Sequence, residues 1–145
     1  MDIKFYEVSQ TSNEKVIPPL LYKIYEQLED NILLLLKDED EIAIYDKLLW
    51  VFSSNKFLPH GTKKDSKDHY KRVFLTNREE NLNQANIILT NKLANPEFLQ
   101  KFSKQIFVFN KQHNDKYINY YQQLKDQANS IDYWQQDAAG KWFKI

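Results

Sequence analysis

Residues 32–36 read Ile-Leu-Leu-Leu-Leu, and this uninterrupted apolar run decides the predicted fold. Its length is that of a strand, and apolar side chains at every position indicate a strand that is covered on both faces. Ile3, Phe5 and Tyr6 predict an earlier strand, and the residues between the two have helical spacing. A strand, a helix and a strand in this order predict a parallel crossover connection.

The helix between these strands is predicted from apolar residues that share one helical face. They are Ile17, Leu20, Leu21, Ile24 and Leu28. Pro18 and Pro19 fit such a helix only in its first turn, where their missing N–H groups are not needed. We therefore expect the helix to begin beside these prolines and to end near Asp30.

The acidic residues 37–41 predict a capping turn, rather than a metal site, before a second helix over residues 42–52. Further strands are expected at residues 72–76, 86–90 and 105–110. Further helices are expected at 96–103 and 114–128. Irregular structure is expected at 62–71 and 131–145. The pattern predicts a single α/β domain over residues 1–145. It would have three layers, with a mainly parallel sheet of about four to five strands flanked by helices in a Rossmann-like topology.

The composition excludes several kinds of chemistry. Twenty basic residues balance twenty acidic ones, so the chain as a whole does not attract phosphate backbones. Absent cysteines exclude thiol chemistry, and Gly61 and Gly140 alone cannot build a glycine-rich nucleotide loop. The three histidines lack metal-site spacing. We expect no catalytic residue, cofactor or metal, and a cytoplasmic protein without a leader or membrane span.

The segment Leu48-Leu49-Trp50-Val51-Phe52 holds more apolar side chains than one helix face accommodates. At about 100° per residue, Leu49 and Phe52 lie on the core-facing stripe, whereas Trp50 points roughly 120° away from its centre. Trp50 is therefore expected outside this core layer. It either packs on a loop of its own chain or anchors a protein interface, and the pattern leaves both alternatives open.

A basic cluster gives a different hypothesis, a site for single-stranded nucleic acid. It consists of Lys63, Lys64, Lys67, Lys71 and Arg72 around Tyr70. Asp65 and Asp68 lie within it, and the chain is neutral overall, so the pattern favours a solvated loop over a nucleic-acid site.

Two motifs resemble the chi subunit of bacterial DNA polymerase III. The first is Leu48-Leu49-Trp50-x-Phe52 with Phe57-Leu58-Pro59-His60-Gly61, and the second is Tyr133-Trp134-Gln135-Gln136-Asp137 with Gly140-Lys141-Trp142. The resemblance implies a non-catalytic adaptor that binds the psi subunit of the clamp loader and the C-terminal tail of single-stranded DNA-binding protein. It would be a monomer when isolated and a heterodimer with psi.

For psi, the resemblance implies contacts through Trp50 and Phe57, with Phe52 and Leu58 beside them, while His60 and Gly61 shape the loop. For the tail, it implies a basic residue on the last helix, an aromatic residue three positions later and an apolar residue from the preceding strand. These positions fall on Ile118, Tyr121 and Val108. Because Ile118, or Tyr117 after a one-residue shift, carries no charge, Lys111, Lys116 and Lys125 are candidates to supply it.

Overall fold

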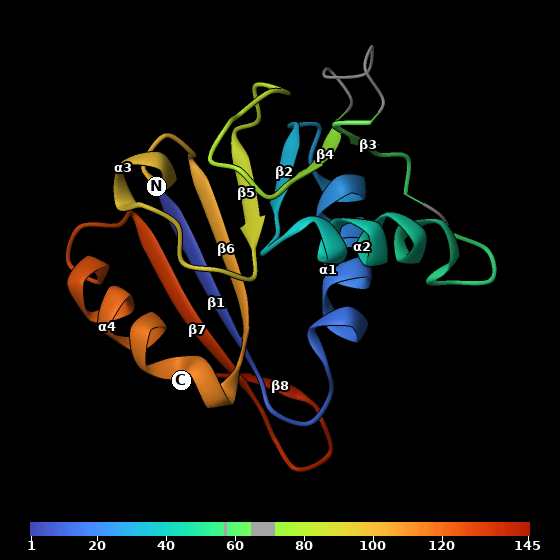
Figure 1. Cartoon of the computed structure of the whole chain (residues 1–145). Helices are drawn as coiled ribbons and strands as arrows, with labels where there is room; N and C mark the ends of the chain where they lie inside the picture. The colour runs from blue at the N-terminus through green and yellow to red at the C-terminus, as the bar shows by residue number, and fades with distance from the viewer. Residues whose placement is uncertain (57, 65–71) are drawn as a thin grey trace.

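The computed structural model describes residues 1–56, 58–64 and 72–145 (Figure 1). Its strands form one sheet in the order β3-β4-β2-β5-β6-β1-β7-β8. They are β1 (Asp2–Val8), β2 (Ile32–Leu35), β3 (Gly61–Thr62), β4 (Val73–Thr76), β5 (Ile87–Thr90), β6 (Lys104–Asn110), β7 (Ser130–Gln136) and β8 (Trp142–Lys144). All neighbouring strands are parallel except β7 and β8, so the predicted α/β class with a mainly parallel sheet is confirmed.

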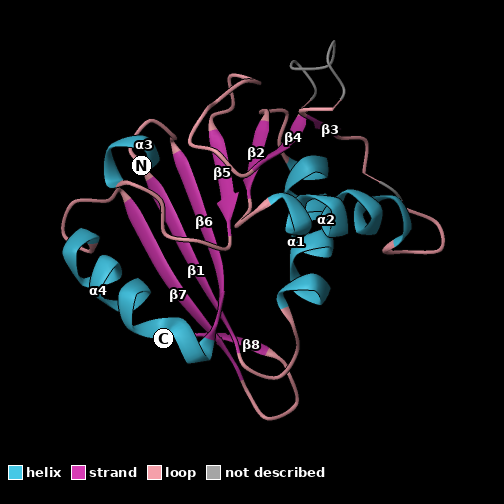
Figure 2. Cartoon of the chain, in the orientation of Figure 1, coloured by secondary structure: helices cyan, strands magenta, loops and turns pink. Residues whose placement is uncertain are grey.

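Helices cover both faces of this sheet (Figure 2). α1 (Asn13–Gln27) and α2 (Glu39–Val51) pack on one face, and α3 (Pro96–Leu99) and α4 (Asn114–Leu124) pack on the other, with a 3-10 turn at Lys111–His113 before α4. The result is the expected three-layer arrangement. Among the described residues, every helix is too short or too polar to reach across a bilayer.

β2 has the environment that its sequence predicts. It lies between β4 and β5, and all four of its residues are completely buried. Ile32 and Leu34 join the core beneath α1 and α2, whereas Leu33 and Leu35 join the core beneath α3 and α4. The connection from β1 through α1 to β2 is the predicted parallel crossover, with β6 and β5 lying between the two strands in the sheet.

The expected position of the two prolines in the first helix is wrong. α1 begins at Asn13, where the Ser12 carbonyl accepts bonds from the N–H groups of Lys15 and Val16, each 3.1 Å long. Pro18 and Pro19 therefore lie inside the helix and remove two of its internal hydrogen bonds. Burial of the face that contains Ile17, Pro18 and Leu21 stabilises the helix in spite of this loss.

The expected number of strands is also wrong, because the described part of the chain has eight. The residues predicted to be irregular at 131–145 contain most of β7 and all of β8, and β3 is a further short strand. Polar residues in β7 interrupt the apolar alternation that predicts a strand, yet they find partners in the fold. The Gln136 side-chain oxygen, for example, accepts bonds from the N–H groups of Ser9 and Gln10, each 2.9 Å long.

The acidic turn caps α2 as predicted. Asp38 is the N-cap residue, and its carboxylate accepts a 2.9 Å bond from the N–H of Glu41. The Glu41 carboxylate accepts a 2.8 Å bond from the N–H of Lys37 in return. These bonds satisfy N–H groups at and just before the helix start, so they set where α2 begins.

Three buried tyrosines make stability sensitive to alkaline pH. Burial raises the pKa of Tyr45, Tyr117 and Tyr133 above the ordinary value of 10.0, and the carboxylate of Glu7, which accepts a 2.6 Å bond from the Tyr133 hydroxyl, adds to the effect there. A neutral hydroxyl is thus favoured in the folded protein compared with the unfolded chain.

We predict that the free energy of unfolding falls as pH rises above 10. Above this value the unfolded chain loses tyrosine protons that the folded protein retains, so it binds fewer protons and becomes favoured. Urea unfolding at several pH values checks the slope, and Tyr117→Phe should make it shallower. Tyrosinate absorbance should rise together with unfolding. If these buried tyrosines ionised in the folded protein, the prediction would be contradicted.

Candidate functional site

The outward face of α2 carries exposed apolar side chains. Trp50 is 47% exposed, Ile44 48% and Val51 63%, while Tyr45 and Leu49 on the opposite face are completely buried. The prediction that Trp50 lies outside the core is confirmed. The sequence reasoning missed Ile44 and Val51, although their seven-residue spacing places both on one face of a helix. We call Ile44, Trp50 and Val51 the α2 surface.

Trp50 rests on a buried histidine that ties α2 to the following loop. The Trp50 and His60 ring centroids are 4.8 Å apart, with the planes tilted by 41°. His60 Nδ1 lies 2.6 Å from the Leu58 carbonyl oxygen, and Nε2 lies 2.6 Å from Asp46 Oδ1. Both ring nitrogens are therefore engaged, and the ring shapes the loop. The described residues contain no group of three or more potential metal ligands.

The other residues expected beside Trp50 have different positions. Leu58 is completely buried, and its N–H donates a 2.9 Å bond to the Leu49 carbonyl, so it supports the surface from below and cannot form it. Phe52 is half-buried and faces α1, with its ring centroid 5.8 Å from that of Tyr22. Phe57 lies outside the described residues.

α4 brings together an aromatic group on the opposite face of the sheet. Tyr117 is buried and stacks on Phe109, with centroids 4.0 Å apart and an angle of 6°. Tyr121 is half-buried, 5.7 Å from the Phe5 ring and 5.5 Å from the Tyr133 ring. Only part of the Tyr121 ring is therefore available to a partner.

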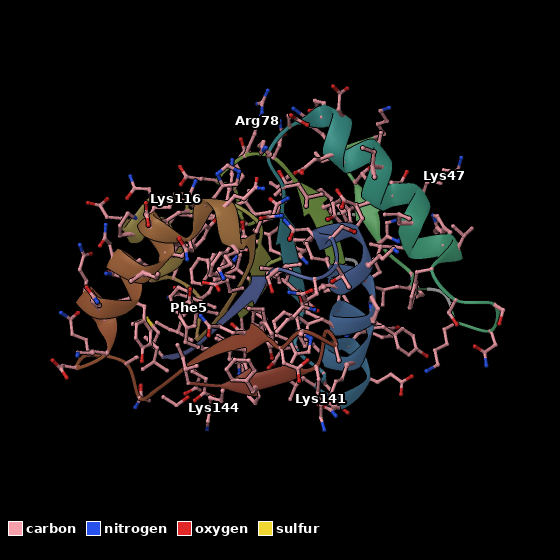
Figure 3. The ribbon with its side chains drawn as sticks, turned by 90° about the horizontal axis from the view of Figure 1, so that it is seen from below. Phe5, Lys47, Arg78, Lys116, Lys141 and Lys144 are labelled. Carbon is pink, nitrogen blue, oxygen red and sulfur yellow. The ribbon has the colours of Figure 1, made fainter. Side chains whose placement is uncertain are left out.

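The charged residues expected here are all exposed, but they do not share one side of α4. They are Lys111, Lys116 and Lys125, and Lys116 projects from α4 (Figure 3). Lys116 Nζ lies 5.5 Å from the centre of the Tyr117 ring. Ile118 is half-buried against the core beneath α4, as an apolar residue is expected to be. Ile118, Tyr121 and Lys125 share one side of α4, whereas Lys116 lies roughly 140° around the helix from Tyr121. We define the α4 surface as these four residues, with Lys116 on its far side.

The expected contribution of Val108 to this surface is wrong. Side chains alternate along β6, so Val108 points into the core beneath α1 and α2, whereas Phe107 and Phe109 point toward α4. A shift of one residue along a strand moves a side chain to the other face of the sheet. Val108 and Tyr121 are consequently separated by the sheet.

One cation of the proposed nucleic-acid cluster, Arg72, is bonded within the fold and is not available to a ligand. Arg72 Nη2 donates to the carbonyl oxygens of Tyr25, Leu28 and Asp30 near the end of α1, and its guanidinium lies 4.3 Å over the Tyr25 ring. Lys63 and Lys64 are exposed. The remaining cluster members, Lys67, Tyr70 and Lys71, lie outside the described residues. In the part of the cluster that the structure describes, only the two lysines are directed to solvent.

Comparison with known proteins gives a consistent result. The family model described as DNA polymerase III chi subunit, HolC, matches residues 1–131, which end just before the Tyr133-Trp134 motif. The chain is also similar to a protein of Rickettsia prowazekii (strain Madrid E) described as "Probable DNA polymerase III subunit chi". The identity is 27% over an alignment 157 residues long, which spans 99% of this chain and 95% of the relative.

We predict that Arg72→Ala lowers the free energy of unfolding by about 1–3 kcal/mol, because it removes charge-assisted bonds to carbonyls at the end of α1. Lys63→Ala and Lys64→Ala are the matched controls, and each should change stability by no more than about 0.5 kcal/mol. Urea unfolding measures all three. Equal effects of the three substitutions would show that Arg72 is an ordinary surface residue.

Proposed function

The chain belongs to the DNA polymerase III chi subunit family, and from this premise we propose that it is a non-catalytic adaptor that links the psi subunit to the C-terminal tail of single-stranded DNA-binding protein during replication. Membership of the family makes it an accessory subunit of the polymerase. The observation that best supports the proposed adaptor role is Trp50, a large aromatic side chain exposed on a rigid base.

The α2 surface is the proposed site for psi. Tryptophan is enriched among the residues that dominate binding energy at interfaces. His60 supports the Trp50 ring from within the fold and is itself held at both nitrogens, so little side-chain freedom remains to be lost on binding. Ile44 and Val51 extend the exposed apolar area, and Phe57 and Phe52 remain in the proposal as further contacts. The isolated chain is proposed to be a monomer, and the complex with psi a heterodimer.

We predict that Trp50→Ala weakens binding of psi by roughly 2 kcal/mol, about 30-fold, while the stability of the isolated chain changes by no more than about 1 kcal/mol. The reason is that the exposed part of the Trp50 ring is buried only in the complex, so its burial stabilises the complex and not the isolated chain. Calorimetric titration with psi and urea unfolding measure the two quantities.

Leu58→Ala is the matched control, since this neighbouring residue is buried. It should lower the free energy of unfolding by about 2–5 kcal/mol through the cavity that it leaves. If Trp50→Ala destabilises the chain as much as Leu58→Ala does, Trp50 has a core role and the proposed psi site is wrong.

The α4 surface is the proposed site for the tail. An acidic peptide with a free carboxylate requires a cation beside an apolar contact. Lys116 and Lys125 offer the charge, and the half-buried Ile118 and Tyr121 offer the apolar contact. Tyr117 lies beneath them in the core and keeps α4 in place by stacking on Phe109.

We predict that a fluorescent peptide copying the tail binds saturably, and that Tyr121→Ala or Lys116→Glu weakens its binding about tenfold or more. The first change removes apolar contact, and the second places a negative charge beside the acidic peptide. Lys47→Glu on the exposed side of α2 is the matched control, with the same change of charge in another layer (Figure 3). An equal loss with Lys47→Glu would mean that only net charge matters. An oligonucleotide measured in parallel should not bind.

A further inference from the structure

A groove of about 540 Å³ lies between α1 and the strands β1, β7 and β8. It belongs to neither of the surfaces described above. Its floor is aromatic: Tyr6 on β1 and Trp134 on β7 are register partners with nearly parallel rings 6.2 Å apart, and Trp142 on β8 meets Tyr6 edge-on at 5.3 Å. Val16 and Leu20 of α1 form an apolar wall. The volume is in the range of known ligand sites.

The charges that line this groove all have the same sign. Lys4, Lys15 and Lys23 are exposed lining residues that form no ion pair among the described residues, and the lining contains no aspartate or glutamate. Asp132 on β7 is the register partner of Lys4 on β1, and its carboxylate lies 3.6 Å from the Lys144 ammonium on β8, so it offsets part of the positive charge at this end of the groove. Because the lining itself remains basic, an anionic ligand is complementary to the groove.

The groove offers hydrogen-bond donors but few acceptors: its lysines and the Trp134 indole N–H, which has no partner among the described residues, are donors. Gln136 accepts from the backbone at Ser9 and Gln10 and donates to Thr11 and Gly140. A nucleic-acid base buried here would lose water from its N–H donors without gaining acceptors for them, which is costly. A bulky apolar side chain has no such donors. The groove thus favours a peptide over a nucleic acid.

We propose that this groove docks an extended acidic peptide segment of a partner protein. One bulky apolar side chain of the segment lies over the floor of Tyr6, Trp134 and Trp142, and its carboxylates lie against Lys4, Lys15 and Lys23. This adds a third binding site to the adaptor function proposed above. It requires neither the α2 surface nor the α4 surface to act as proposed.

The three tryptophans of the chain allow a direct test, because Trp134 and Trp142 line the groove while Trp50 lies on α2. The indole N–H signals of the full chain, assigned with Trp→Phe variants, are followed by NMR. The probe is a short synthetic peptide of aspartates with one central phenylalanine. The Trp134 and Trp142 signals should shift saturably while the Trp50 signal stays in place, and replacing the phenylalanine of the peptide by alanine should weaken binding about tenfold or more.

Two charge reversals check the site. Lys15→Glu with Lys23→Glu should weaken peptide binding about tenfold or more, whereas the matched pair Lys47→Glu with Lys101→Glu, exposed residues outside the groove, should leave it unchanged. Circular dichroism verifies that both variants fold. The proposal is overturned if the groove signals do not move, if the Trp50 signal moves in their place, or if oligothymidylate shifts them more strongly than the peptide. The Trp134 and Trp142 signals report on the groove, whereas the tail proposal is tested with Tyr121→Ala and Lys116→Glu and the psi proposal with Trp50→Ala, so failure of one proposal is distinguishable from failure of the others.

Discussion

Complete burial of β2 constrains the rest of the structure. A strand with apolar side chains at every position exposes a large apolar area on both faces unless both are covered. α1 and α2 cover one face, and α3 and α4 cover the other, so the sheet must lie between two separate cores. Because side chains alternate along a strand, successive residues of each strand then enter different cores. The positions of all three proposed sites depend on this division.

The sequence predicted those elements whose signal is local. The apolar run of β2 and the capping carboxylate of Asp38 each need only neighbouring residues, and the orientation of Trp50 needs only the helical angle between adjacent residues. Leu58 and Arg72 could not be placed in this way. Leu58 is buried through a bond to Leu49, and Arg72 is held by carbonyls about 40 residues earlier in the chain, so neither position is visible in the local pattern.

The last two strands show the same limit. In β7, Tyr133 and Gln135 donate side-chain bonds to Glu7 on β1. The parallel pairing of the two strands joins residues more than 120 positions apart, as between Asp2 and Ser130. Periodicity in one segment cannot reveal such a pairing, and therefore it could not predict the groove that Trp134 and Trp142 complete. The misplacement of Val108 has a related cause. The strand that contains Val108 was predicted correctly. An error of one residue in choosing the position along it, however, moves the chosen side chain from one core to the other.

The division into two cores also bears on how an adaptor of this kind would hold several ligands. The proposed α2 and α4 surfaces lie in different helix layers with the sheet between them, and they share no residue. Effects of changes at well-separated sites without common partners are generally additive. Coupling between distant sites requires an element with two discrete arrangements, and here a closely packed sheet separates the two surfaces. The physical expectation is therefore that each ligand binds with an affinity independent of the other, so that a link between them arises from simultaneous occupancy of one rigid domain.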